Sequence, residues 1–291
     1  LLDVTISPPS YSRLPVINQR DNGNVTGLPG TAVSFIVNST KKLETANLSF
    51  DDGTEIQLNV SNRQATGSFR IRNDAQYRIV LNDENGNQNL TPITYSIRAL
   101  LDAYPSMEMI YPNKNVPLPS DNRLALVARI QDDYGFNKLL LHYRLSASRY
   151  DFPQENFTSI EIPINKNSKE ENVQYIWNMS RLNLATEDEV TYYLEIFDND
   201  AVSGPKSTKT SMFLVRVPSL DDILAGAEDI QQKAEKDLIE TLKEAQELKE
   251  TLEKLEQELR QDKKEITWQE KEKIEQALQK FEELQEKVEQ V

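Results

Sequence analysis

Paired acidic residues are the side chains in this sequence that most suggest a chemical site. Two runs, Asp132-Asp133 and Asp198-Asn199-Asp200, end segments of alternating apolar residues, and Glu195 lies on the second segment. Carboxylates are hard oxygen ligands of the kind that Ca²⁺ prefers. The candidate calcium ligands are Asp132, Asp133, Glu195, Asp198 and Asp200. The alternative, that they form Asx turns at strand ends, is favoured because the twelve-residue calcium loop with a terminal Glu is missing.

The single histidine limits the catalysis that this chain could perform. His142 alternates with Leu139, Leu141 and Tyr143, which predicts a solvated side chain on the opposite face of a strand. The sequence has no Gly-x-Ser-x-Gly elbow, no glycine-rich phosphate loop and no cysteine. We therefore predict that the protein is not an enzyme and has no cofactor, calcium being the one ion to consider.

The charge of the chain is acidic and unevenly distributed. The net charge is −14, and residues 219–291 account for −10 of it, with 12 Lys and Arg against 22 Asp and Glu. Binding a polyphosphate requires a basic surface, so nucleic acid is not expected as a partner. The chain begins at Leu1 and has no apolar run long enough to span a membrane. Any membrane attachment is expected from segments outside this sequence.

Residues 1–99 have the pattern of an immunoglobulin-like β-sandwich. Apolar residues alternate with polar ones around Phe35, Leu58, Phe69 and Ile79, which is typical of half-buried strands. Asp52-Gly53 and Asn85-Gly86 are hairpin turn signals. Residues 74–79 resemble the tyrosine corner of immunoglobulin domains: the Tyr77 hydroxyl would tie down the local turn, and Ile79 stands where those domains have a cysteine.

Residues 100–218 predict a second β-sandwich after a join at 100–106. Seven short strands are expected, and no helical period interrupts them. Trp177 is predicted to be a core residue. The expected strands are 107–111, 124–130, 138–145, 158–164, 173–177, 190–197 and 208–217.

Residues 219–291 predict an acidic coiled-coil arm, with helices at about 220–261 and 268–291. Ser219 can cap the first helix, and Thr267 with Glu270 forms a capping box for the second. A helical hairpin is the preferred interpretation, with a bent continuous rod as the alternative. Such a hairpin buries little by itself, so self-association or a protein partner is expected. The expected interaction seam is Leu248, Leu252, Leu255, Leu259, Ile274, Phe281, Leu284 and Val288.

Four short segments, within a match that spans roughly residues 3–240, resemble an uncharacterised family of bacterial membrane-anchored envelope proteins. They are 8–15 (Pro-Pro-Ser-Tyr-Ser-Arg-Leu-Pro), 30–33 (Gly-Thr-Ala-Val), 132–135 (Asp-Asp-Tyr-Gly) and 198–206, which contains Asp-Asn-Asp and Ser-Gly-Pro-Lys. In that family, transmembrane helices precede immunoglobulin-like modules and a long coiled-coil region. The resemblance implies an extracytoplasmic location, on the periplasmic face of a bacterial membrane, and carries over no catalytic residue.

The sequence therefore predicts a mainly β plus α protein: two tandem immunoglobulin-like β-sandwiches followed by a long coiled-coil helical hairpin. The predicted function is a non-catalytic interaction or structural module of a membrane-anchored envelope protein, which assembles through its arm. The alternatives are a carbohydrate- or polymer-binding β-sandwich protein, which an exposed row of tyrosines would support, and a hydrolase or calcium-dependent adhesin, which converging carboxylates would support.

Overall fold

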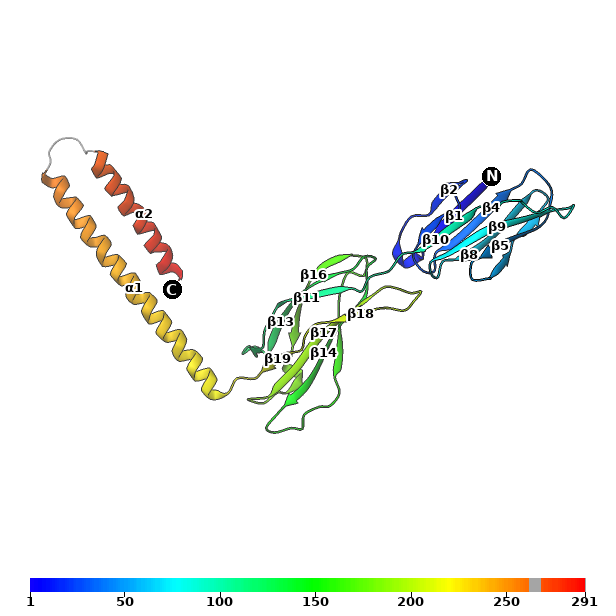
Figure 1. Cartoon of the computed structure of the whole chain (residues 1–291). Coiled ribbons are helices and arrows are strands. Elements are labelled where there is room, and N and C mark those ends of the chain that lie inside the picture. Colours follow the sequence, from blue (N-terminus) through cyan, green and yellow to red (C-terminus); the bar gives the residue numbers. More distant parts are fainter. Residues whose placement is uncertain (262–267, 291) are drawn as a thin grey trace. The chain divides into compact units, whose positions relative to one another are not determined.

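The computed structural model describes residues 1–261 and 268–290, and side chains within those ranges except at 255, 258–261, 269–270, 273 and 286–290. The chain divides into two compact units, Leu1–Val217 and Pro218–Val291. The first unit consists of two β-sandwiches with separate apolar cores, and the second is a helical arm (Figure 1). This agrees with the predicted class of β-sandwich modules followed by helices.

The first sandwich has two five-stranded sheets, ordered β2-β1-β4-β8-β7 and β3-β10-β9-β5-β6. Its core includes Phe35, Leu48 and Tyr77, each at most 1 % exposed. Its elements are β1 (Leu2–Ser7), the 3₁₀ turn η1 (Ser10–Ser12), β2 (Ile17–Arg20), β3 (Val25–Gly27), β4 (Ala32–Asn38), β5 (Leu43–Phe50), β6 (Glu55–Gln57), β7 (Asn59–Ser61), β8 (Gln64–Arg70), β9 (Ala75–Asp83) and β10 (Thr94–Ala99).

The predicted tyrosine corner is present as a residue pattern but makes a different hydrogen bond. The buried Tyr77 hydroxyl donates to the carbonyl of Gly23, in the connection between β2 and β3, and not to the turn beside it. That segment passes close by because β3 pairs in parallel with β10, the neighbour of β9. Ile79 is buried, as an apolar replacement for the cysteine requires.

The second sandwich packs a three-stranded sheet, β11-β13-β16, on the sheet β12-β19-β17-β14-β15, with β18 pairing to β17. Trp177 lies in the core as predicted, at 2 % exposed. Residues 208–217 form two short strands instead of the single one expected. The elements are β11 (Ser106–Tyr111), β12 (Val116–Pro117), β13 (Arg123–Gln131), β14 (Phe136–Ala147), β15 (Thr158–Ile162), β16 (Glu170–Asn178), the 3₁₀ turn η2 (Ser180–Leu182), β17 (Glu189–Asp198), β18 (Ser207–Lys209) and β19 (Phe213–Arg216).

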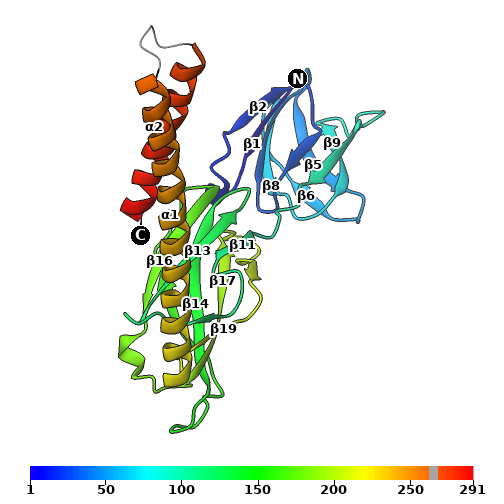
Figure 2. The same ribbon diagram turned by 90° about the vertical axis from the view of Figure 1, so that its left-hand side faces the viewer.

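The arm has one long helix, α1 (Leu220–Gln261, 42 residues), and a shorter one, α2 (Trp268–Gln290, 23 residues). Ser219 and Asp222 cap α1 reciprocally: the Asp222 N–H donates to Ser219 Oγ, and the Ser219 N–H donates to the Asp222 carboxylate. α2 lies alongside the C-terminal part of α1 (Figures 1 and 2). Neither helix, over its described residues, contains an apolar stretch of the length needed to cross a membrane.

A carboxylate in the β9 turn gives the first sandwich a pH-dependent contribution to stability. Asp83 accepts the backbone N–H groups of Asn87 and Asn85, and Lys41 Nζ lies 3.2 Å away. The bonds from Asn87, assisted by Lys41, lower the pKa of Asp83 from 3.8 to about 2. Because the folded-state pKa is depressed, this stabilisation is complete above pH 3.8 and is lost as the pH falls through about 2.

Replacing Asp83 by Asn should therefore lower the Tm at neutral pH, with the gap to the wild type closing as the pH falls towards 2. Thermal unfolding followed by circular dichroism across this range measures the gap. Glu84→Gln, which changes a neighbouring and more exposed carboxylate, is the control and should lower the Tm less. A gap between wild type and D83N that is constant with pH would contradict the proposed origin of the effect.

Candidate functional site

The four segments quoted above from the sequence meet at the junction between the two sandwiches. The Tyr11 hydroxyl donates to Asp102 Oδ2 at 3.0 Å, and the Asn199 amide donates to the carbonyls of Tyr11 and Tyr134. Arg13 donates to the backbone and side-chain oxygens of Asn167. These bonds join the first sandwich to loops of the second.

Gly30 also belongs to this junction. Its φ of +87° is a conformation that glycine adopts without strain. A Cβ at this position would lie 2.8 Å from Val202 Cγ1, so a larger residue would push on the β17–β18 loop. The loop therefore comes so close to the first sandwich at this position that only the hydrogen side chain of glycine fits.

The ammonium group of Lys206 is at the centre of the junction. Nζ lies 2.6 Å from Asp198 Oδ2, 3.2 Å from Asp102 Oδ2 and 3.5 Å from Asp200 Oδ2. The three carboxylate side chains are at most 8 % exposed. Burial opposes the charged ammonium, but the hydrogen bonds to Asp198 and Asp102 outweigh it and raise the pKa of Lys206 above its ordinary value.

The remaining carboxylates of the junction shape its turns. Asp132 accepts the N–H groups of Tyr134 and Gly135, and Asp200 accepts those of Val202 and Ser203. These are the Asx turns favoured by the sequence. Burial raises the pKa of Asp132 despite these bonds.

The junction holds more negative than positive charge. Burial also raises the pKa of Asp102, although Tyr11 and Lys206 act in the opposite direction. One oxygen each of Asp102, Asp132 and Asp133 is buried without a hydrogen-bond partner. Lys206 therefore neutralises only part of this cluster.

The five residues expected as one calcium site do not form one ligand set. Asp132, Asp133, Asp198 and Asp200 lie at the junction, but Glu195 points from the other face of β17 and contacts His142, Ser207 and Lys209. Within the described residues, no three His, Cys, Asp or Glu side chains are grouped to hold a metal ion. Glu195 therefore lies apart from the other four candidates because its side chain has the opposite direction, and Lys206 lies among Asp102, Asp198 and Asp200.

His142 is not solvated, contrary to the sequence-based expectation. Its ring stacks on Tyr193 with centroids 4.7 Å apart, and its Nε2 lies 3.1 Å from Glu195 Oε2. The side chain is 15 % exposed, and burial lowers the pKa of His142. Over the part of the chain that the structure describes, no Ser or Thr hydroxyl hydrogen-bonds to His142, so the geometry offers no hydrolytic pair with this histidine.

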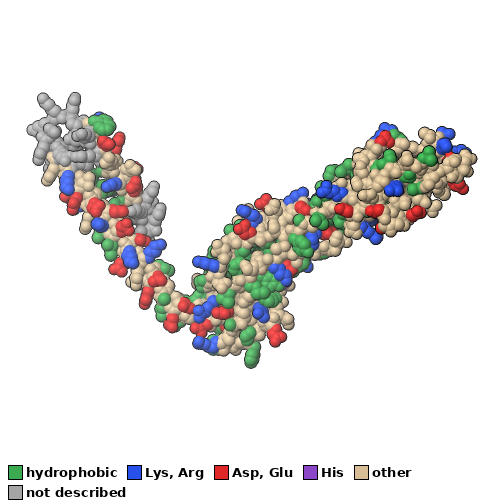
Figure 3. Space-filling model, viewed as in Figure 1, with side chains coloured by type: hydrophobic (Ala, Val, Ile, Leu, Met, Phe, Trp, Pro, Cys, Tyr) green, Lys and Arg blue, Asp and Glu red, His purple; other side chains and the backbone are tan. Residues whose placement is uncertain are grey.

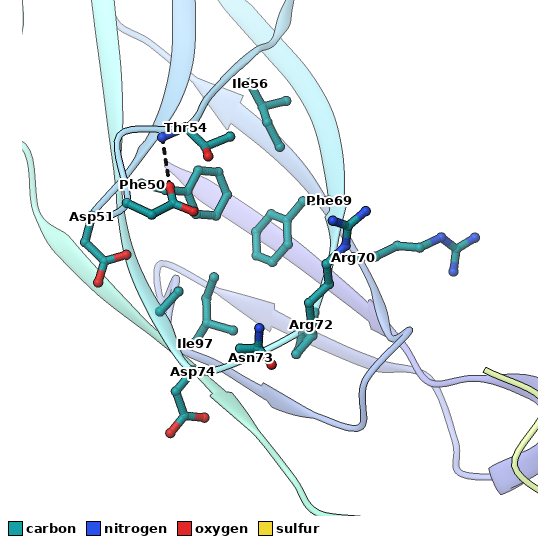
Figure 4. A pocket seen from close by; sticks show the side chains of 13 residues that line it. Phe50, Asp51, Thr54, Ile56, Phe69, Arg70, Arg72, Asn73, Asp74 and Ile97 are labelled. Carbon is teal, nitrogen blue, oxygen red and sulfur yellow. Dashed lines mark hydrogen bonds between the residues drawn. The ribbon is translucent and has the colours of Figure 1, made fainter. Parts of the chain in front are cut away.

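A cavity of about 760 Å³ opens between the sheets of the first sandwich. Phe50 and Phe69 form its apolar floor, and Asp51, Arg72 and Asp74 lie around the opening (Figure 4). Among the described residues that line it, no buried polar atom lacks a hydrogen-bond partner. Acidic and basic side chains are mixed around the opening. Neither the shape of the cavity nor its charge therefore indicates a class of ligand.

The exposed tyrosines do not form the row that would favour carbohydrate binding. Tyr104 lies in the linker, Tyr111 at the end of β11 and Tyr150 in the loop after β14. These three sites are in a linker, a strand and a loop, so they are not a row along one sheet.

The predicted seam of the arm is closed over only part of its length. Leu248 and Ala277 are buried against each other's helix, with Ile274 and Leu284 packed beside them. Leu252 and Phe281 are about half exposed, at 48 % and 55 %. The side chains of Leu255, Leu259 and Val288 lie outside the described residues, as does Thr267 of the capping box. Trp268, at the start of α2, is 76 % exposed.

The N-terminal half of α1 carries apolar side chains that α2 is too short to cover. α1 is 19 residues longer than α2, or about 28 Å at the rise of an α-helix. Ile223, Ile230 and Leu238 are 55 %, 73 % and 60 % exposed. Apolar side chains are visible on the arm among acidic and basic ones (Figure 3). We call the following set the open stripe: Leu220, Ile223, Leu224, Ala227, Ile230, Ala234 and Leu238.

Sequence reasoning missed Lys206, Asp102 and Tyr11 as residues of the junction. Tyr11 and Lys206 lie within the segments that carry the family resemblance. The resemblance could therefore have singled out these two positions. Their role could not be predicted from local patterns, because Tyr11 and Lys206 lie 91 and 104 residues from Asp102 along the chain.

Comparison with known proteins adds little to this geometry. No family model matches the chain, and no curated protein matches it. Among solved structures, the fibronectin(III)-like modules of CbhA from Clostridium thermocellum match 74 % of this chain and 94 % of that one, at 13 % identity and a TM-score of 0.27.

Two further structures match with similar scores. Dimeric latent PorU from Porphyromonas gingivalis matches 68 % of this chain and 19 % of its own, at 15 % identity and a TM-score of 0.25. A Salmonella alpha-2-macroglobulin mutant matches 75 % and 15 %, at 11 % identity and a TM-score of 0.26. Similarities this weak carry no function to this chain.

Proposed function

We propose that this protein is a non-catalytic extracytoplasmic interaction and structural module of a membrane-anchored bacterial envelope protein. The two β-sandwiches act as a stalk, and the coiled-coil arm joins the stalk to other polypeptide chains. The location rests on the resemblance of the four junction segments to the envelope family. The assembly role rests on the arm.

The open stripe is the observation that carries the assembly role. Soluble monomers rarely expose a continuous apolar surface, and such surfaces mark interaction sites. On α1, Leu220, Ile223, Leu224, Ile230 and Leu238 are all more than half exposed. Turned at 100° a residue, the whole stripe occupies about 120° of the helix, the width of a packing face.

The junction supports the stalk role of the sandwiches. Lys206 bonds to Asp102 in the linker and to Asp198 and Asp200 in the second module, while Tyr11 of the first module bonds to Asp102. These bonds connect the linker to both modules at once. They therefore favour a fixed connection between the modules over a flexible one.

The alternative functions have less support. A calcium-dependent adhesin would need converging carboxylates that are free to bind the ion, and Lys206 already holds three of them. A carbohydrate- or polymer-binding module would need an aromatic face, and the exposed tyrosines are scattered.

Site-specific photo-cross-linking in cells of the producing organism tests the assembly role. A photoreactive residue in place of Ile230, on the open stripe, should give a discrete adduct in the envelope fraction. The matched control is Ile239, which is similarly exposed, at 59 %, but lies outside the stripe, about 120° around the helix from its centre. Adducts at neither position, or equally at both, would count against assembly through this face.

A further inference from the structure

We propose that the open stripe binds a basic amphipathic helix of a partner protein. This inference rests on the proposed assembly function and names the chemistry of the partner. It follows from the charges that flank the stripe. Residues 220–240 carry seven acidic side chains and two lysines.

The acidic side chains lie where a docked helix would meet them. Glu228 and Glu235 follow one edge of the stripe, and Asp237 lies at the other. None of these three carboxylates forms an ion pair with any side chain that the structure describes. A helix seated on the stripe would place its own flanking residues against them, as e and g positions do in a coiled coil.

The same charges argue against a second copy of this chain as the occupant. In a parallel or an antiparallel pair of identical stripes, edges dominated by Glu and Asp would face each other. Like charges at such positions destabilise the pair. A partner helix with Lys or Arg beside its apolar residues would instead form ion pairs along both edges. The charge pattern therefore selects a basic partner.

Two synthetic three-heptad peptides provide the probe. Both have Leu at the a and d positions, with Lys at e and g in one and Glu at e and g in the other. Fluorescence anisotropy with the full chain should give at least about tenfold tighter binding of the Lys-flanked peptide. Added salt should weaken that binding, because the ion pairs are exposed.

Variants of the chain locate the binding. Ile230→Ser with Leu238→Ser should weaken binding of the Lys-flanked peptide by about tenfold or more. Ile239→Ser, which lies outside the stripe at about 120° from its centre, should not weaken it. Glu228→Lys with Glu235→Lys should reverse the preference towards the Glu-flanked peptide. Circular dichroism must show that each variant keeps its helix content.

Three results would overturn the inference. The first is equal binding of the two peptides, and the second is loss of binding in Ile239→Ser as large as in the stripe variant. The third concerns the isolated chain, which should be monomeric by light scattering. An oligomer that the Ile230→Ser and Leu238→Ser changes dissolve would make the occupant a second copy. In that last case the proposed assembly through the arm would be supported, and only the proposal of a basic partner helix would be wrong.

Discussion

Replacing Lys206 by Met should destabilise the second sandwich by about 3–5 kcal/mol, the usual loss when one partner of a buried ion pair is removed. The ammonium is within 3.5 Å of three carboxylates, and the Asp198 side chain is 1 % exposed. Without Lys206 these carboxylates must become protonated or open the loop to water. Urea unfolding of the full chain measures the loss, with Trp268→Phe as background so that the buried Trp177 reports on this module.

Two control variants separate the buried network from general charge loss. Lys209 pairs with Glu195 at 3.7 Å but its side chain is 55 % exposed, so Lys209→Met should cost less than about 1 kcal/mol. Adding Asp198→Asn to Lys206→Met should recover part of the loss, because it removes one uncompensated charge. Equal losses for the two lysine variants would show that the junction is not a buried charge network.

Calcium provides a further check on the role of Lys206. Millimolar calcium should leave the wild type unchanged, because the ammonium occupies the position of a cation. In Lys206→Met, the ion can approach Asp102, Asp198 and Asp200 and should restore some of the lost stability. Stabilisation of the wild type by calcium would return the adhesin alternative to consideration.

Replacing Leu248 by Ala should destabilise the arm by about 2–4 kcal/mol, which is the range for large-to-small changes at buried leucines. Leu248 is 6 % exposed and packs with Ala277, Ile274 and Leu284, which are the whole described core of the arm. A core of this size has little to replace a lost contact. Thermal loss of the helical circular-dichroism signal reports the effect, since the other modules are β-sheet.

Leu252 supplies the matched control for the arm. It lies one turn further along α1 and is 48 % exposed, so Leu252→Ala should cost less than about 1 kcal/mol. If both substitutions lowered the midpoint equally, Leu248 would not be the residue that closes the two helices. If neither did, the hairpin would contribute nothing to the stability of α1.

Alternation predicted several strands well because their inward residues form regular runs. Val33, Phe35 and Val37 in β4 are buried while their neighbours are exposed or half-buried. β5 was not predicted: its apolar residues are separated by a register shift between Leu43 and Thr45, which breaks the period of two. Residues 208–217 were predicted as one strand because the pattern does not reveal the break between β18 and β19.

The long coiled-coil hairpin was anticipated only in part. Composition and the spacing of Leu, Ile and Ala are sufficient to predict two helices and the residues between which they start and end. Pairing depends on the relative lengths of the helices, and α2 is too short to accompany α1 throughout. Leu252 and Phe281 are about half exposed, so coiled-coil packing along the full arm stays a prediction.

The class of each segment follows from local patterns: alternation and turn residues predict the strands, and helical spacing with caps predicts the arm. The tertiary structure alone decided which charges meet. Lys206 is 104 residues from Asp102 along the chain, and the two are within 3.2 Å because the β17–β18 loop folds back on the linker. Glu195 is only three residues from Asp198, yet strand alternation turns it away to His142. Periodicity is a property of neighbours in sequence, whereas a charge cluster depends on where distant loops come together.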